Sequence, residues 1–178
     1  MTCACRSAFS TFVSSMAFQH FGSAVLLIVV TSFIHGAGTL VVFWMLFRSR
    51  MFAVRHFGSV HNAGLLTSVV VALLAVHLIE AACWATFYSY KGCFADFNTS
   101  LYFSMITYTT VGYGDIVLRD RQWRLLAGLE AMTGPLMLCW STVILVQVIT
   151  TIYLQRRETW EGEESPAPER IHHSNRGQ

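Results

Sequence analysis

Charged residues are missing from four long stretches of the chain, and this pattern predicts where helices lie. No Lys, Arg, Asp or Glu occurs at positions 7–47, 56–79, 97–114 and 131–155. The stretches 7–47, 56–79 and 131–155 reach the roughly 20 residues that a membrane-spanning helix requires. The stretch 97–114 is shorter. The pattern predicts an all-α integral membrane protein whose three transmembrane helices lie at about residues 21–47, 64–88 and 122–154.

The shorter uncharged stretch begins with signals for a helix start. Asp96, Asn98 and Thr99 have side chains that cap helix N-termini, and the apolar sequence LYFSMITY follows them. A helix of about ten residues is too short to cross a bilayer. Irregular backbone at membrane depth is tolerated only where it lines a water-filled cavity or is buried in protein. We therefore predict a re-entrant helix followed by a functional loop.

That loop has the sequence TYTTVGYGD at positions 107–115. Gly112 and Gly114 permit positive φ without a Cβ clash, and their alternation with other residues can turn successive carbonyls toward one side. Four such strands around an axis would form stacked rings of oxygen atoms that replace the hydration shell of a cation. The predicted ligands are the carbonyls of Thr110, Val111, Gly112 and Tyr113, with the Thr110 hydroxyl at the inner end.

The sequence TTVGYGD at positions 109–115 resembles the potassium-channel signature, and it lies between a short apolar helix and a long one, as in that family. The resemblance covers about residues 64–154 and is closest to small bacterial channels with an outer helix, a pore helix, a selectivity filter and an inner helix. It implies a homotetramer that conducts K⁺ passively, because one filter strand cannot enclose an ion. It also implies that K⁺ binds at Thr110, Val111, Gly112 and Tyr113. Thr109, Gly114 and Asp115 would support the filter, and Asp115 would accept a hydrogen bond from the pore helix.

The last apolar segment matches the inner helix of that family. Gly134 lies nineteen residues after Asp115, where such channels carry a hinge glycine, and Pro135 removes a backbone donor. Gating motion about Gly134 and a static kink or close helix packing are equally compatible with these residues. Polar and apolar residues then recur at near-helical spacing, and we predict that most of them face the pore: Leu138, Thr142, Val146, Gln147 and Thr150.

Two acidic residues lie inside predicted membrane spans. Glu80 is sixteen residues from Gly64 and Glu130 is eight residues from Gln122, which places them roughly 24 Å up one helix and roughly 12 Å down the other. Both depths match that of the pore helix. We interpret Glu80 and Glu130 as supports of the pore helix or filter, with at least one of them protonated or hydrogen-bonded, against the alternative of structural contacts between helices.

Histidines accompany these acids. His77 lies three residues before Glu80 and shares its helix face, which indicates a structural pair. In the first span, Gly36 and Gly38 indicate close helix packing. His35 beside them is interpreted as a buried residue with one hydrogen-bond partner, in preference to a proton sensor.

The predicted organisation has four parts: an N-terminal segment at 1–20, an additional helix with a basic loop at 21–55, a pore domain at 56–155 and a disordered cytoplasmic tail at 156–178. Arginine and lysine are equally frequent near both membrane faces, so the orientation depends on the resemblance. It places the C-terminus in the cytoplasm and the N-terminus on the outer side of a cell membrane. The protein itself is expected to be in contact with membrane lipid. Cys3, Cys5 and Cys93 would then be external, where an oxidised bridge is possible.

Composition excludes several other classes. Charged residues make up 12% of the chain, about half the share in a soluble domain. No basic run with interleaved aromatic residues indicates nucleic-acid binding. The sequence contains no nucleophile–base pair and no cysteine-based metal site that would indicate an enzyme. No cofactor is expected. Two alternatives to a K⁺ channel stay open: a weakly selective cation channel, and a membrane sensor or accessory subunit that does not conduct.

Overall fold

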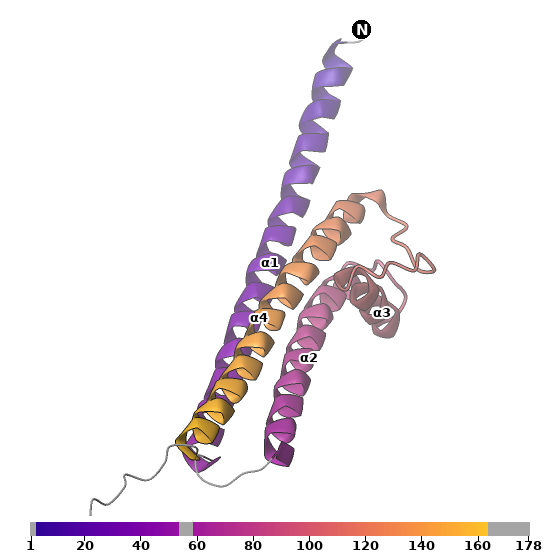
Figure 1. Ribbon diagram of the computed structural model, residues 1–178. Helices are drawn as coiled ribbons and strands as arrows, with labels where there is room; N and C mark the ends of the chain where they lie inside the picture. The colour runs from indigo at the N-terminus through magenta and orange to yellow at the C-terminus, as the bar shows by residue number, and fades with distance from the viewer. Residues whose placement is uncertain (1–2, 54–58, 164–178) are drawn as a thin grey trace, which may run out of the picture.

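The computed structural model describes residues 3–53 and 59–163. Its elements in chain order are α1 (Cys3–Ala53), α2 (Ser59–Tyr90), α3 (Phe97–Tyr108), the 3-10 turn η1 (Arg121–Trp123) and α4 (Arg124–Glu163). Every regular element in these two ranges is helical, which confirms the predicted all-α class. Figure 1 shows α1, α2 and α4 as long rods and α3 as a short helix at one end of α2.

Within residues 3–53 and 59–163, three helical segments are long and apolar enough to cross a membrane. They are Phe21–Arg48, Ala63–Tyr90 and Arg121–Thr151, close to the predicted spans. α1 nevertheless begins at Cys3, so the predicted N-terminal segment is continuous with the first span, and this end of α1 projects beyond the other helices in Figure 1. The N-terminus and the α3–α4 loop lie at one end of the molecule, and α4 ends at the other.

The predicted disordered tail requires a correction. α4 continues to Glu163, so residues 156–163 are helical rather than disordered. This segment, RRETWEGE, contains no proline, and the first proline of the tail is Pro166. Extending an existing helix costs far less than nucleating a new one, so a polar segment directly after a long helix can continue it. Residues 164–178 lie outside the described ranges.

The helices pack around two apolar clusters. One lies around the junction of α2, α3 and α4 and contains Trp84, Tyr88, Phe103 and Trp123. The other joins α1, α2 and α4 through five buried aliphatic residues: Val42, Val69, Leu73, Ile144 and Val148. The first cluster holds α3 against the long helices, which positions the loop that follows α3.

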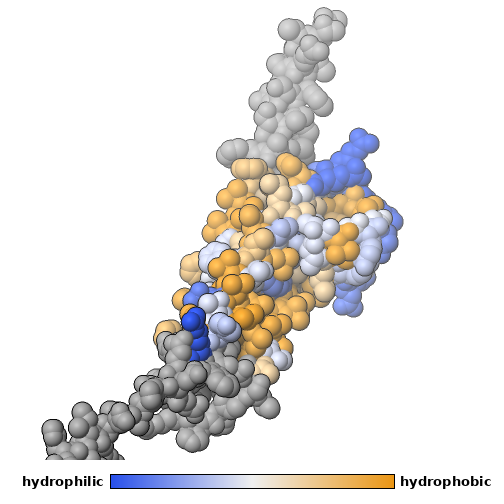
Figure 2. Space-filling model, viewed as in Figure 1, coloured by the Kyte–Doolittle hydropathy of each residue, from blue (hydrophilic) through white to orange (hydrophobic). Residues whose placement is uncertain are grey.

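The outer surface of the helices is apolar as well. Large side chains such as Phe33, Leu40, Leu136 and Val143 are exposed on the single chain. Figure 2 shows this surface as a broad hydrophobic band, with hydrophilic residues gathered near the end where α3 lies. An apolar surface of this extent is covered by lipid or by other protein.

α1 approaches α2 closely at one glycine. A Cβ on Gly38 would lie 2.4 Å from Cγ2 of Val76, whereas a Cβ on Gly36 would meet nothing within 4 Å. The predicted close packing therefore applies to Gly38 and not to Gly36. This contact brings His35, one turn earlier on α1, against α2.

Candidate functional site

The site begins with the way in which α3 starts. Asp96 is its N-cap, and its carboxylate accepts a hydrogen bond from the Thr99 backbone N–H at 2.7 Å, as the sequence predicted. These hydrogen bonds from Thr99 lower the pKa of Asp96 below its ordinary value. The cap fixes the start of α3 and therefore the place where the helix ends, twelve residues later at Tyr108.

The backbone after α3 alternates in handedness over the loop 109–115. Thr110, Gly112 and Gly114 have φ values of 59°, 53° and 76°, and the intervening Val111 and Tyr113 are not in the positive-φ region. The positive φ predicted to be permitted at both glycines is thus present. Such alternation reverses the peptide orientation from one residue to the next, which lets consecutive carbonyls face one side.

Thr110 adopts the left-handed conformation without being glycine, which the sequence did not indicate. A β-branched residue rarely has positive φ, and such strain costs about 1–3 kcal/mol. Its amide donates to Thr107 O at 2.9 Å, and the Gly112 amide donates to Ile106 O at 3.0 Å. These bonds tie the loop back to the last turn of α3 and hold the strained residue in place.

The far end of the loop is attached to α3 by a side chain. The Tyr102 hydroxyl donates to Oδ2 of Asp115 at 2.8 Å, which confirms the predicted hydrogen bond from the short helix to Asp115. This bond to a carboxylate raises the pKa of Tyr102. The loop is therefore held at its beginning by the backbone of α3 and at its end by Tyr102.

Glu130 on α4 contacts α3 from its buried side. Its Oε1 lies 2.5 Å from the Ser104 hydroxyl, and its Oε2 accepts a hydrogen bond from Tyr88 of α2 at 2.7 Å. All three side chains are buried. Glu130 thereby joins α2, α3 and α4, and the expectation that at least one of the two acids is protonated or hydrogen-bonded is confirmed.

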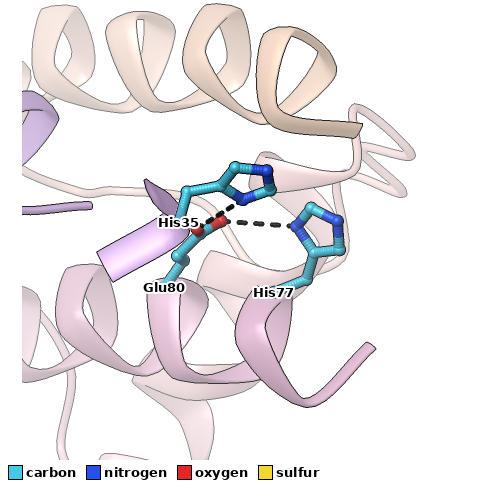
Figure 3. Close-up of side chains that lie close together, drawn as sticks. All are labelled: His35, His77 and Glu80. Atoms are coloured by element: carbon cyan, nitrogen blue, oxygen red, sulfur yellow. Dashed lines mark hydrogen bonds and ion pairs between the residues drawn. The ribbon is translucent and has the colours of Figure 1, made fainter. Parts of the chain in front are cut away.

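Glu80 on α2 contacts the last residue of α3. Its Oε2 accepts a hydrogen bond from the Tyr108 hydroxyl, and its Oε1 lies 2.9 Å from Nδ1 of His35 on α1. Nδ1 of His77 is 3.3 Å from Oε2, which confirms the predicted pairing of His77 with Glu80. Nε2 of His77 lies 2.9 Å from the Ser141 hydroxyl of α4. Figure 3 shows the two imidazoles on either side of the carboxylate.

No direct signal in the sequence indicates that His35 joins this group, because 45 residues separate it from Glu80. A weaker signal was present in the spacing of polar residues in the first span. Thr31, His35 and Thr39 recur every four residues and are all buried. Polar residues at this spacing share one helix face, and that face points away from lipid.

Gly134 lies where α4 crosses the end of α3. A Cβ at this position would lie 1.8 Å from the backbone oxygen of Tyr108, so only glycine fits. α4 continues as a helix through Pro135. This contact supports close packing, one of the two interpretations left open for Gly134, and hinge motion stays a prediction.

The predicted pore-lining residues share one property. On the single chain all of them are exposed: Leu138, Thr142, Val146, Gln147 and Thr150. The surface that they form is thus free for water, lipid or another subunit. That they line a pore stays a prediction.

Comparison with known families bears directly on this arrangement. Residues 65–151 match the ion channel family. The match supports a channel function and covers the segment from α2 to α4 that contains the 109–115 loop, Glu80 and Glu130. With the three apolar helices it also supports a membrane protein. α1 lies outside the matched residues, and no curated protein and no solved structure matches the chain.

Proposed function

We propose that this chain is one subunit of a homotetrameric, K⁺-selective channel. The observation that carries the proposal is the alternation of positive φ at Thr110, Gly112 and Gly114, directly after a short capped helix. In four chains around an axis, this backbone would present stacked carbonyl rings that replace the hydration shell of K⁺. The ligands would be the carbonyls of Thr110, Val111, Gly112 and Tyr113.

The exposure of the loop supports assembly. On the single chain, the side chain of Val111 is 51% exposed and that of Tyr113 is 74% exposed. Both side chains are large, and both follow the C-terminal end of α3. In a tetramer, neighbouring subunits would cover these side chains and leave the carbonyls toward the axis. Val111 and Tyr113 would then fix the width of the filter from behind.

Glu80 and Glu130 would support this filter indirectly, through Tyr108 and Ser104 of α3. In the proposed orientation, the loop end of the molecule and the N-terminus face outward, and α4 ends in the cytoplasm. The shared placement of the N-terminus and the α3–α4 loop at one end supports this orientation.

Ion flux through the purified chain in liposomes tests the proposal. We expect K⁺ uptake well above Na⁺ uptake in the wild type and loss of this preference in Tyr113→Ala. The matched control is Tyr90→Ala, because Tyr90 is also highly exposed, at 81%, but is the last residue of α2 and not part of the 109–115 loop.

Each outcome of this experiment separates the candidate functions. Equal K⁺ and Na⁺ flux in the wild type would identify a weakly selective cation channel. No flux of either ion from a verified wild-type tetramer would contradict the proposal and favour a non-conducting subunit. Loss of selectivity in Tyr90→Ala would show that the effect is not specific to the loop.

A further inference from the structure

A cluster of three metal-ligating side chains lies where α1 meets the other helices. His35 of α1 and His77 and Glu80 of α2 each offer a ligand atom, and these atoms all lie within 4.8 Å of one another. His35 and Glu80 are fully buried, and the His77 side chain is 11% exposed. We infer that this cluster binds one divalent transition-metal ion of the Zn²⁺ type.

The chemistry of the donors favours that class of ion. Imidazole nitrogen suits Zn²⁺, Co²⁺, Ni²⁺ and Cu²⁺, whereas Mg²⁺ and Ca²⁺ prefer sites made only of oxygen. Two histidines with one glutamate form a donor set that proteins use for zinc, with an open position for water. The cluster is therefore selective for transition metals over the abundant alkaline-earth ions.

The distances leave a small adjustment for binding. With metal–ligand distances of about 2.0–2.2 Å, neighbouring ligands of a tetrahedral ion are roughly 3.4 Å apart. Oε1 of Glu80 lies 2.9 Å from His35 Nδ1, and Oε2 lies 3.3 Å from His77 Nδ1. Both separations are within roughly half an ångström of the tetrahedral value, so the adjustment that binding requires is small.

The charge at this position also favours a cation. In the part of the chain that the structure describes, the ion-pair partners of Glu80 are His35 and His77, which carry charge only when protonated. A buried carboxylate without a permanent cation is costly. A divalent ion would supply the missing positive charge at neutral pH.

The surroundings resemble the outer shell of a metal site. His77 Nε2 lies 2.9 Å from the Ser141 hydroxyl, which would accept the N–H of this ring when Nδ1 holds the metal. The Tyr108 hydroxyl bonds to Glu80 and orients the carboxylate. By contrast, Nε2 of His35 is buried without a hydrogen-bond partner in the described ranges, so this ring, unlike that of His77, has no outer-shell partner within them.

Titration of the purified full chain with Co²⁺ tests the inference, because Co²⁺ bound by nitrogen and oxygen gives visible absorption bands. The seven histidines of the chain include the adjacent pair His172 and His173. The reference protein and every variant compared with it therefore carry alanine at His172 and His173, and none of them carries a histidine tag. We expect one Co²⁺ per chain, displaced by Zn²⁺ and not by excess Mg²⁺.

The variants His35→Gln and His77→Gln should each weaken Co²⁺ binding at least tenfold and remove the absorption bands. Glutamine can still hydrogen-bond to Glu80, so both variants should stay folded, which thermal unfolding without metal checks. Ser141→Ala, which removes only the partner of the His77 ring, should weaken binding about tenfold. The matched control is Thr142→Ala, whose exposed side chain bonds only to its own helix.

Stoichiometric binding that is lost in both histidine variants supports the inference. Absence of Co²⁺ binding by the wild type, or binding unchanged in both variants, overturns it. Absence of binding together with a pH-dependent stability that needs His35 and His77 would identify the proton as the ligand and also overturns it. The readout is binding alone, so it does not depend on whether the chain conducts K⁺.

Discussion

The two sides of α3 are held by the same kind of bond in different surroundings. On the buried side, Ser104 and Tyr108 bond to Glu130 and Glu80 of the long helices. On the exposed side, the partners are the N-cap Asp96 and, through Tyr102, Asp115 of the loop. Each side combines hydroxyl groups with carboxylates, but water competes for only one of them.

This difference assigns different tasks to the two sides. An unpaired buried donor or acceptor has no water to replace its partner, so the buried bonds fix where α3 sits in the bundle. The exposed bonds have water as an alternative, so they adjust the ends of α3 and the shape of the loop. We therefore expect changes on the buried side to have the larger effect on stability.

The largest effect is expected from Gly134→Ala, which acts on the backbone of the buried side. The new Cβ would lie 1.8 Å from Tyr108 O, a backbone atom that cannot rotate away. Overpacking of this kind costs about 1–3 kcal/mol and sometimes more, so we expect a clearly lower unfolding temperature in detergent and loss of the proposed tetramer.

Gly38→Ala is the matched control for that variant. Its Cβ would meet a methyl group of Val76, which can change rotamer, instead of backbone. The expected loss of stability is much smaller. Equal losses in the two variants would contradict the view that α4 is fixed by its approach to the end of α3.

The next largest effect is expected at Glu130. Glu130→Ala leaves the buried hydroxyl of Tyr88 without its acceptor, at about 1–3 kcal/mol, whereas the Ser104 hydroxyl still has Ala81 O at 2.8 Å. Glu130→Gln keeps one acceptor oxygen and should lose less. Thermal unfolding and the K⁺ over Na⁺ flux ratio measure the two consequences separately.

A filter-supporting role predicts that Glu130→Gln changes the flux ratio or the decay of flux with time. If this variant conducts with unchanged selectivity and inactivation, Glu130 is a structural contact and not a support of the filter. Tyr88→Phe removes the hydrogen bond from α2 to Glu130, leaves the bond from Ser104 of α3 in place, and serves as the control. It should lower stability without changing selectivity.

The comparison of the two sides also explains what the sequence could predict. Local signals identified the three spans, the short helix, the Asp96 cap and the glycines of the 109–115 loop, because each depends on neighbouring residues. The pairing of His77 with Glu80 is local as well, since they are three residues apart. The membrane depth of Glu80 and Glu130 further indicated contacts with α3.

Contacts between distant segments were not predictable in the same way. The approach of His35 to Glu80 depends on Gly38 packing against α2, and the contact of Gly134 with Tyr108 depends on the angle of α4. The positive φ of Thr110 is imposed by hydrogen bonds to α3 against the preference of a β-branched residue. The helical continuation to Glu163 follows from the length of α4 and not from the composition of residues 156–163.

The smallest effect is expected on the exposed side, from the titration of Asp96. Its pKa in the folded chain is below the ordinary value of 3.8, because Thr99 hydrogen-bonds to the carboxylate. A group with a lowered folded pKa stabilises the fold at pH values above its ordinary pKa, and this contribution is lost as the pH falls below it. Asp96→Asn keeps a capping side chain but removes the titration. Between pH 6 and about pH 3, the unfolding temperature of the wild type should therefore fall slightly more than that of Asp96→Asn. The same dependence in both would show that other carboxylates, and not the cap of α3, set the response to acid.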